Sequence, residues 1–172
     1  VLGAKYDMGL FADPFLRMGK QEDDPADVRA EDRLHREPAR AIARETIVLL
    51  ENRNQTLPLK KQGTIALVGP LAESGLDILG SWSAQGVPEQ AVTVRAGIEK
   101  AIEGKARLVT ARGANVLDDK KVVDYLNFLN WDKPEVVQDP RPIETMIEEA
   151  VAVAREADVV IAVVGDLRGM SH

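Results

Sequence analysis

The sequence predicts an α/β fold, a three-layer α/β/α sandwich built on a mostly parallel sheet. Three short apolar runs have the length and composition of buried strands, at residues 64–69, 107–111 and 159–165. Amphipathic helical patterns separate them, at residues 94–102 and 142–154. Strands that alternate with helices in this way are joined by right-handed crossovers, which leaves the strands parallel and the sheet covered by helices.

The first helix of this fold is predicted at residues 38–50. Pro38 suits the first turn of a helix, where the N–H that proline lacks would have no partner. Ile42, Ile47 and Leu50 recur at helical spacing, and the apolar face is wide enough that we expect burial on more than one side.

The three strands differ in expected burial. Residues 65–69 form a continuous apolar run, which is typical of a central strand covered on both faces. A Gly/Ser-rich loop follows at residues 72–86, and residues 107–111 form a shorter strand. Residues 159–164 are the longest apolar run and give the clearest pattern of a buried strand in the chain.

Two further helices complete the pattern. Residues 122–129 are predicted to form a helix capped by Asp118. Pro142 is expected to begin another helix. The side chains of the second helix that should face inward are Ile143, Met146, Ile147, Ala150, Val151 and Ala154.

The N-terminal part has a different composition from the rest. Residues 1–16 are too few to form a hydrophobic core of their own. Residues 17–37 are almost entirely charged or polar, as in a solvated linker between domains. The α/β domain is therefore assigned to residues 38–172. The sequence starts without Met and stops directly after a strand, so we expect it to be part of a longer protein.

Composition excludes several classes of function. The 172 residues include 22 Lys and Arg against 28 Asp and Glu, a net charge of −6, which argues against a nucleic-acid-binding surface. No apolar run approaches the ~20 residues that span a bilayer, so we predict no membrane segment. Cysteine is absent, which excludes disulfides and thiolate chemistry.

Nucleotide and metal signatures are also missing. Gly69 is followed by Pro70 and neither phosphate-binding glycine motif is completed. His35 and His172 are far apart, and neither belongs to a ligand pair. We therefore predict no cofactor and no metal site. A structural role and a site-facing role for His172 both stay open, because it follows a strand end.

Loops at the carboxyl ends of parallel strands are where ligands bind. Trp82 is the best candidate there, because an aromatic ring in a Gly/Ser loop can stack on a sugar; packing against a neighbouring domain is the alternative. Glu73 and Asp77 are interpreted as solvated loop residues, and Asp166 as a residue that hydrogen-bonds its own turn. No self-contained catalytic set is present in the sequence.

Seven segments of the sequence, taken in order, form a recognisable series: KYDMGLF at residues 5–11, ARETIVLLEN at 43–52, LPL at 57–59, IALVGPLA at 65–72, GSWS at 80–83, VTV at 92–94 and the strand at 158–165. This series resembles family 3 glycoside hydrolases, and the nearest likeness is to the bacterial periplasmic β-glucosidases. The resemblance covers essentially the whole sequence. It implies that residues 1–16 close a TIM-like barrel domain and that residues 38–172 begin the α/β sandwich that follows it.

The resemblance also implies a mechanism. Such enzymes cleave terminal β-linked glucose from oligosaccharides or glucosides with retention, using an Asp nucleophile and a Glu acid/base in a cleft between the two domains. Neither acid can be assigned to a position of this sequence, so the isolated chain is expected to be inactive. The residues expected nearest the substrate are Trp82, Ser83, Arg168, Met170 and His172. Export to the periplasm or secretion is implied by likeness alone.

The partners expected are a β-glucoside or oligosaccharide, the barrel domain and the remainder of the sandwich, with a homo-oligomer as an open option. An exposed apolar edge strand would also favour aggregation or a partner chain. Two other interpretations compete with the enzyme: a non-catalytic carbohydrate-binding or interaction module, and a flavodoxin-like or response-regulator-like domain. The sequence lacks the acidic cluster after the first strand that the last of these would carry.

Overall fold

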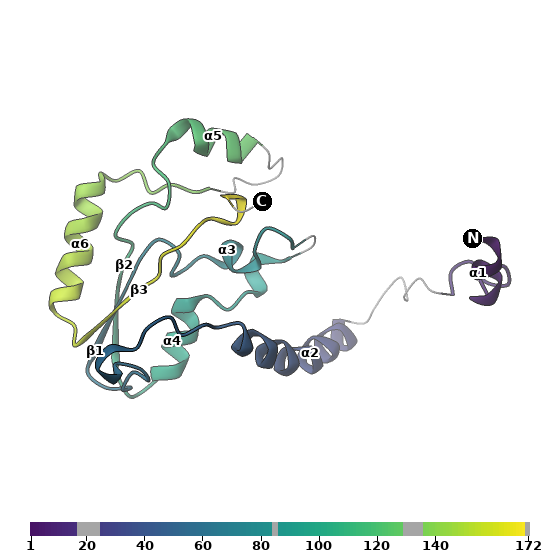
Figure 1. Cartoon of the computed structure of the whole chain (residues 1–172), viewed down its shortest axis with the longest axis horizontal. Helices are drawn as coiled ribbons and strands as arrows, with labels where there is room; N and C mark the ends of the chain where they lie inside the picture. The colour runs from purple at the N-terminus through teal and green to yellow at the C-terminus, as the bar shows by residue number, and fades with distance from the viewer. Residues whose placement is uncertain (17–24, 84–85, 129–135, 171–172) are drawn as a thin grey trace. The chain divides into compact units, whose positions relative to one another are not determined.

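A computed structural model of the chain describes residues 1–16, 25–83, 86–128 and 136–170, with residues 25–33 described by their backbone (Figure 1). The chain divides into two compact units, Val1–Pro58 and Leu59–His172. The elements in chain order are α1 (Leu2–Asp7), α2 (Pro25–Glu45), η1 (Arg53–Gln55), β1 (Thr64–Val68), α3 (Gly75–Leu79), η2 (Pro88–Gln90), α4 (Val94–Ile102), β2 (Arg107–Ala111), α5 (Lys120–Phe128), α6 (Ile143–Arg155), β3 (Val159–Ala162) and η3 (Arg168–Met170).

Helix α2 of the first unit differs from the helix that the sequence predicts. It begins at Pro25, so Pro38 lies inside it, because the Ala, Arg and Glu residues of the charged segment are good helix formers. It ends at Glu45, where the Thr46 hydroxyl donates to the Ala43 carbonyl at 2.8 Å. The β-branched residues that follow Thr46 disfavour a helix.

The apolar residues expected to bury this helix are exposed. They are Ile42 in α2 and Ile47, Val48, Leu49 and Leu50 after it. Within Val1–Pro58, the described residues contain no second long helix or strand against which these side chains could pack.

The second unit is built on a parallel sheet of three strands in the order β2-β1-β3. β1 lies in the centre, and Ile65, Ala66 and Leu67 are buried, with Leu67 at 0% exposure. Leu67 is paired with Thr110 on one side and Ile161 on the other. The predicted α/β fold and the predicted central strand are confirmed.

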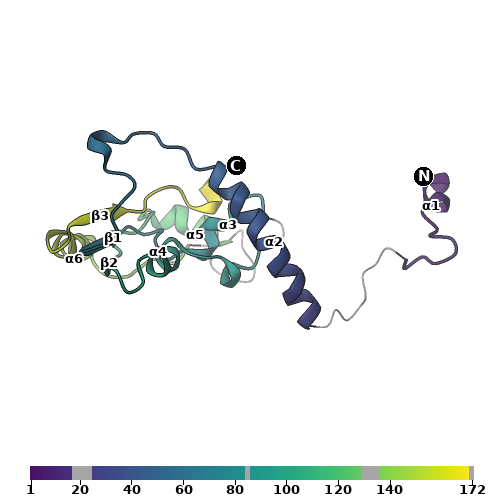
Figure 2. The same cartoon turned by 90° about the horizontal axis from the view of Figure 1, so that it is seen from below.

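Helices cover both faces of this sheet. The chain moves from β1 outward to β2 and then crosses back over β1 to β3. Right-handed crossovers in these two directions place α4 and α6 on opposite faces, as Figures 1 and 2 show. α6 packs on β1 and β2, and its Met146 side chain is buried. The Thr93 hydroxyl caps α4 by accepting the Ala96 N–H at 3.1 Å.

β3 is less buried than the sequence predicts. Among the described strands it pairs with β1 alone, so it forms an edge of the sheet. Along β3 and the two residues that follow it, the side chains alternate: Ile161 and Val163 are half-buried, whereas Val160 is 48% and Val164 76% exposed. The apolar composition of this segment correctly predicted a strand, but it did not predict that alternate side chains of the strand would be exposed.

The inward face of α6 is also only partly buried. Of the six side chains expected to face inward, Met146 is buried and Ala150 and Ala154 are half-buried. The larger side chains at the margins of this face, those of Ile143, Ile147 and Val151, are exposed.

A second small hydrophobic core lies beside α5, between residues of the segment that joins β2 to α6 and a residue that follows β3. Val123 and Leu126 of α5 are buried, as their helical spacing predicted, whereas Val122 is exposed. The two buried side chains form a cluster with Val136 and Leu167. The cap of α5 is Asp119 and not Asp118, because the Asp119 carboxylate accepts the Lys121 N–H at 2.8 Å. Leu129 lies outside the described residues. Because Leu167 follows β3, this core ties the loop after β3 to α5.

Candidate functional site

The carboxyl edge of the sheet contains a topological switch point. From β1 the chain continues to β2 on one side, whereas β3 lies on the other. In open parallel sheets, ligands bind outside the carboxyl ends of the strands at such a reversal, because the loops diverge there and leave a crevice. The loops that leave β1 and β3 at this point carry the two groups of predicted site residues, around Trp82 and around Arg168.

Gly69 allows these two loops to start in contact. Its φ is +116°, and a Cβ atom built on it would lie 2.2 Å from the carbonyl oxygen of Val163. A second close approach joins Gly165 to Leu71, where a Cβ would meet the Leu71 Cδ1 atom at 3.3 Å. The turns after β1 and β3 are therefore closely packed at the switch point.

The loop that carries Trp82 closes back onto α3. A Cβ on Gly75 would lie 2.5 Å from the Pro88 carbonyl oxygen, and one on Gly86 would lie 2.6 Å from the Leu79 Cδ1 atom. The Ser83 hydroxyl donates to the Gly80 carbonyl at 3.0 Å. The Trp82 side chain is 92% exposed. The ends of the loop are therefore packed closely against neighbouring residues, while the indole ring of Trp82 is exposed to solvent.

The second group lies on η3, a single turn after β3. Leu167 and Gly169 are buried, whereas Met170 is exposed. The Arg168 N–H donates to the Asp77 carboxylate on α3 at 2.8 Å. α3 and η3 are therefore in contact, and α3 connects directly to the Trp82 loop.

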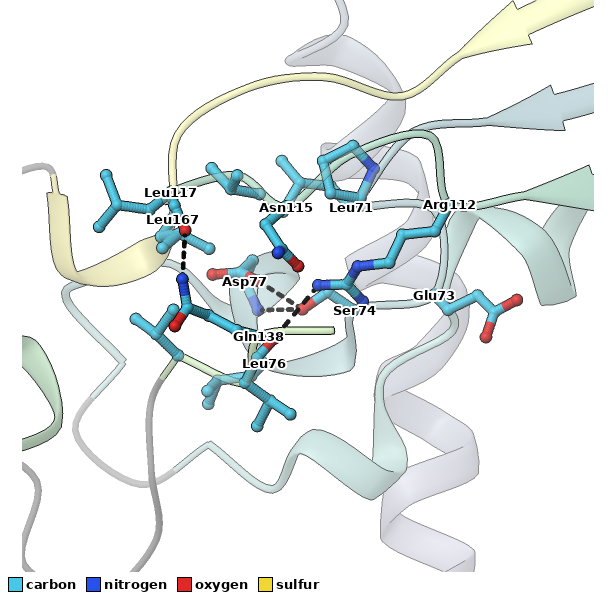
Figure 3. Close-up of a pocket in the computed structure, with 14 residues that line it drawn as sticks. Leu71, Glu73, Ser74, Leu76, Asp77, Arg112, Asn115, Leu117, Gln138 and Leu167 are labelled. Atoms are coloured by element: carbon cyan, nitrogen blue, oxygen red, sulfur yellow. Dashed lines mark hydrogen bonds between the residues drawn. The ribbon is translucent and has the colours of Figure 1, made fainter. Parts of the chain in front are cut away.

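A cavity of about 230 Å³ lies beside these elements (Figure 3). Its lining residues come from the loops after all three strands: Pro70, Leu71, Glu73, Ser74, Leu76, Asp77, Arg112, Asn115, Val116, Leu117, Val136, Val137, Gln138 and Leu167. The Arg112 guanidinium extends into it and donates to the Val137 carbonyl at 3.2 Å, while its Nε is buried without a hydrogen-bond partner among the described residues. Gln138 donates to the Leu117 carbonyl at 2.9 Å.

A second cavity, of about 360 Å³, shares Arg112 and Glu73 with the first. Arg141, which also lines it, pairs with Asp139 and Glu149, each at 2.7 Å. The hydrogen bond from Arg141 lowers the pKa of Asp139 to about 2, and hydrogen bonds to both carboxylates raise the pKa of Arg141. The charged groups of this cavity largely neutralise each other.

Glu73 is held in a similar way. It pairs with Arg95 of α4, which also bonds Glu99 at 2.9 Å. The hydrogen bonds to Glu99 and Glu73 raise the pKa of the Arg95 guanidinium. A carboxylate engaged in this way is not positioned as a free acid or base.

Comparison with known proteins identifies the family. A model of the glycosyl hydrolase family 3 C-terminal domain matches residues 47–171. The chain belongs to glycosyl hydrolase family 3. It is 56% identical over 172 residues to the periplasmic beta-glucosidase of Salmonella typhimurium, a match that covers 100% of this chain and 22% of that protein.

Solved structures agree with this family 3 assignment. The chain superposes on the beta-glucosidase from Listeria innocua in complex with isofagomine with a TM-score of 0.65 at 30% identity, covering 99% of this chain and 20% of that one. A beta-glucosidase involved in saponin metabolism from intestinal bacteria gives a TM-score of 0.69 at 30% identity, covering 99% and 23%. The chain therefore spans about a fifth of the length of these relatives.

Of the residues predicted from the sequence, four lie on the two loops at the switch point of this family 3 fold. Trp82 and Ser83 follow α3, and Arg168 and Met170 belong to η3, which lies against α3. His172 lies outside the described residues. The structure therefore brings the two groups together through α3.

The interpretation of Asp77 as a solvated residue is wrong. Asp77 is partly buried and bonds both Ser74 and the Arg168 N–H. Glu73 is exposed as expected but ion-paired, and Asp166 is exposed.

Sequence reasoning missed Arg112, Asn115 and Gln138, which line the first cavity. Arg112 and Asn115 come directly after β2, so their place at a strand end was a usable signal. Gln138 lies far from β2 in the sequence, so its local pattern does not indicate a place near the end of that strand. Only the fold brings the segment of Gln138 back to β2. There the Asp139 N–H donates to the Asn115 Oδ1 atom at 2.9 Å, and the Asn115 side-chain amide donates to the Asp139 carbonyl at 3.1 Å.

Within the described residues, no group of three or more His, Asp and Glu side chains is arranged to hold a metal ion. Among the same residues, no helix has both the length and the apolar character needed to cross a bilayer.

Proposed function

We propose that this chain is part of a longer family 3 β-glucosidase that removes terminal β-linked glucose with retention of configuration. The observation that carries the proposal is the 56% identity to a periplasmic beta-glucosidase along the whole chain. The proposal assigns residues 1–16 to the end of a barrel domain, residues 17–37 to a linker and residues 38–172 to the first part of the sandwich. A periplasmic or secreted location is part of the same proposal.

The role proposed for this segment is to form part of the substrate-binding rim. Retention requires a nucleophile and an acid/base ~5–5.5 Å apart across the scissile bond. Both acids are assigned to parts of the enzyme outside these residues. This chain contributes Trp82, whose ring can stack on a sugar, together with Ser83, Arg168, Met170 and, beyond the described residues, His172.

A chimera tests the proposed function. The matching segment of the Salmonella typhimurium enzyme is replaced by these 172 residues, and hydrolysis of an aryl β-glucoside is measured. We expect kcat/KM within about tenfold of the intact enzyme, which corresponds to a change of about 1.4 kcal/mol in transition-state stabilisation. A folded chimera, with an unchanged melting temperature, that hydrolyses no β-glucoside contradicts the proposal.

Substitution of Trp82 tests the rim. In the chimera, Trp82→Ala is expected to raise KM for a disaccharide by about 2- to 12-fold, since an aromatic stacking contact contributes about 0.5–1.5 kcal/mol. The matched variant Trp82→Phe keeps a stacking face and should recover most of the affinity. Because the ring is 92% exposed, neither change should lower the melting temperature. An unaltered KM for Trp82→Ala would remove this residue from the rim.

A further inference from the structure

We propose that Asp77 is a positioning residue that holds the η3 turn against α3 and thereby fixes Arg168 and Met170 relative to the Trp82 loop. The inference rests on the proposed function, because it gives these two loops a shared task at the substrate-binding rim. In this proposal, Asp77 supports the two loops from α3 and does not itself contact the substrate.

The Asp77 carboxylate uses both of its oxygen atoms for this purpose. Oδ1 accepts the Arg168 N–H at 2.8 Å, across 91 positions of sequence. Oδ2 accepts the Ser74 hydroxyl at 2.5 Å, and the Ser74 oxygen in turn accepts the Asp77 N–H at 3.1 Å. Bonds to an ionised carboxylate are about twice as strong as neutral ones. Ser74 therefore orients the carboxylate that holds the turn.

The start of the η3 turn is anchored separately from Asp77. The Leu167 side chain lies in the small core beside α5, and the Met170 N–H donates to the Leu167 carbonyl at 2.9 Å. Asp77 adds a directional bond at the next residue, Arg168. A turn fixed at two successive residues has a defined orientation, so this bond sets where the exposed Met170 side chain is presented.

The same residue is connected to the Trp82 loop. The Gly80 N–H donates to the Asp77 carbonyl at 3.1 Å, so Asp77 closes the last turn of α3 immediately before Trp82. The base of that loop is anchored by the close approach of Gly86 to Leu79. One residue thus bonds the turn after β3 through its side chain and the loop after β1 through its backbone.

The test uses Asp77→Ala and Asp77→Asn with two measurements. In the 172-residue chain, hydrogen exchange of the peptide that contains Arg168 is followed by mass spectrometry. In the chimera, kcat and KM are measured with a disaccharide substrate. We expect Asp77→Ala to speed exchange at Arg168 about tenfold or more, and to raise KM several-fold while kcat stays within about twofold. Asp77→Asn keeps an acceptor oxygen and should recover most of both.

Asp158→Ala is the matched control, because the Asp158 carboxylate also accepts a backbone N–H from a residue far away in sequence, that of Thr64 at 2.8 Å, but just before β3, at the opposite end of the strand from η3. It should change neither exchange at Arg168 nor KM. Unchanged exchange in Asp77→Ala, faster exchange with an unchanged KM, or an equal rise in KM in Asp158→Ala would each overturn the proposal. An inactive parent chimera instead contradicts the proposed function, while the exchange measurement still reports whether Asp77 holds the turn.

Discussion

The purified 172-residue chain is expected to hydrolyse no aryl β-glucoside at a measurable rate. Loss of a positioned general acid alone costs about 10²- to 10⁴-fold, and without a nucleophile no glycosyl-enzyme forms. The proposed function assigns the nucleophile and the acid/base to parts of the enzyme outside these residues, and the acids near the candidate rim are not expected to replace them. Glu73 is paired with Arg95, and both oxygens of Asp77 are engaged in hydrogen bonds.

This expectation is checked by release of the chromogenic aglycone, with the active chimera as the positive control. Turnover by the isolated chain comparable to that of the chimera would contradict it. Calorimetry on the same chain tests the alternative of a non-catalytic carbohydrate-binding module. Tight binding of glucose or a disaccharide without hydrolysis would favour that module over the enzyme.

Gly69→Ala, at the residue directly after β1, is expected to cause a large loss of stability. The added Cβ would lie 2.2 Å from the Val163 carbonyl oxygen, and the φ of +116° is one that L side chains rarely adopt. Backbone strain and overpacking each cost about 1–3 kcal/mol, so roughly 2–6 kcal/mol is expected. This loss is a large share of the ~5–15 kcal/mol that stabilises a domain.

Gly104→Ala is the matched control for this effect. Its φ of +67° is also left-handed, but an added Cβ would have no atom of the described residues within 4 Å. It should cost only about 1–2 kcal/mol. Urea unfolding followed by circular dichroism compares the two variants. Failure of Gly69→Ala to fold agrees with the expectation, whereas a loss no larger than that of Gly104→Ala contradicts it.

The identity of the strands and of most helices in the second unit could be predicted from local pattern. The run from Ile65 to Leu67 contains no polar side chain, so a buried central strand was the expected structure and is the observed one. Met146 lies at the centre of the apolar stripe of α6 and is buried as expected. These features depend on residues close together in the sequence, whose spacing encodes which face is apolar.

Burial at the margins could not be predicted in the same way. Val160 and Val164 belong to an apolar run, yet both are exposed. Val160 lies on β3, which is an edge strand in the described sheet, and Val164 lies beyond the end of that strand. Helix α2 likewise extends through residues whose charge suggested a linker, because charge and helix propensity are independent properties. The burial of a side chain depends on the order of the strands and on the elements packed beside it. Neither can be deduced from the composition of a segment.

For the candidate site, the chain's local chemistry pointed to two loops that follow strand ends but not to the residues that hold these loops in place. Trp82 was recognisable because it is an aromatic residue in a Gly/Ser-rich loop that follows a strand, where its ring can stack on a sugar. Asp77, by contrast, resembled any other acidic loop residue until folding brought the Arg168 N–H to its carboxylate. Short-range patterns carry the hydrophobic periodicity of each element, whereas a hydrogen bond between residues 91 positions apart exists only after strands β1 and β3 have paired.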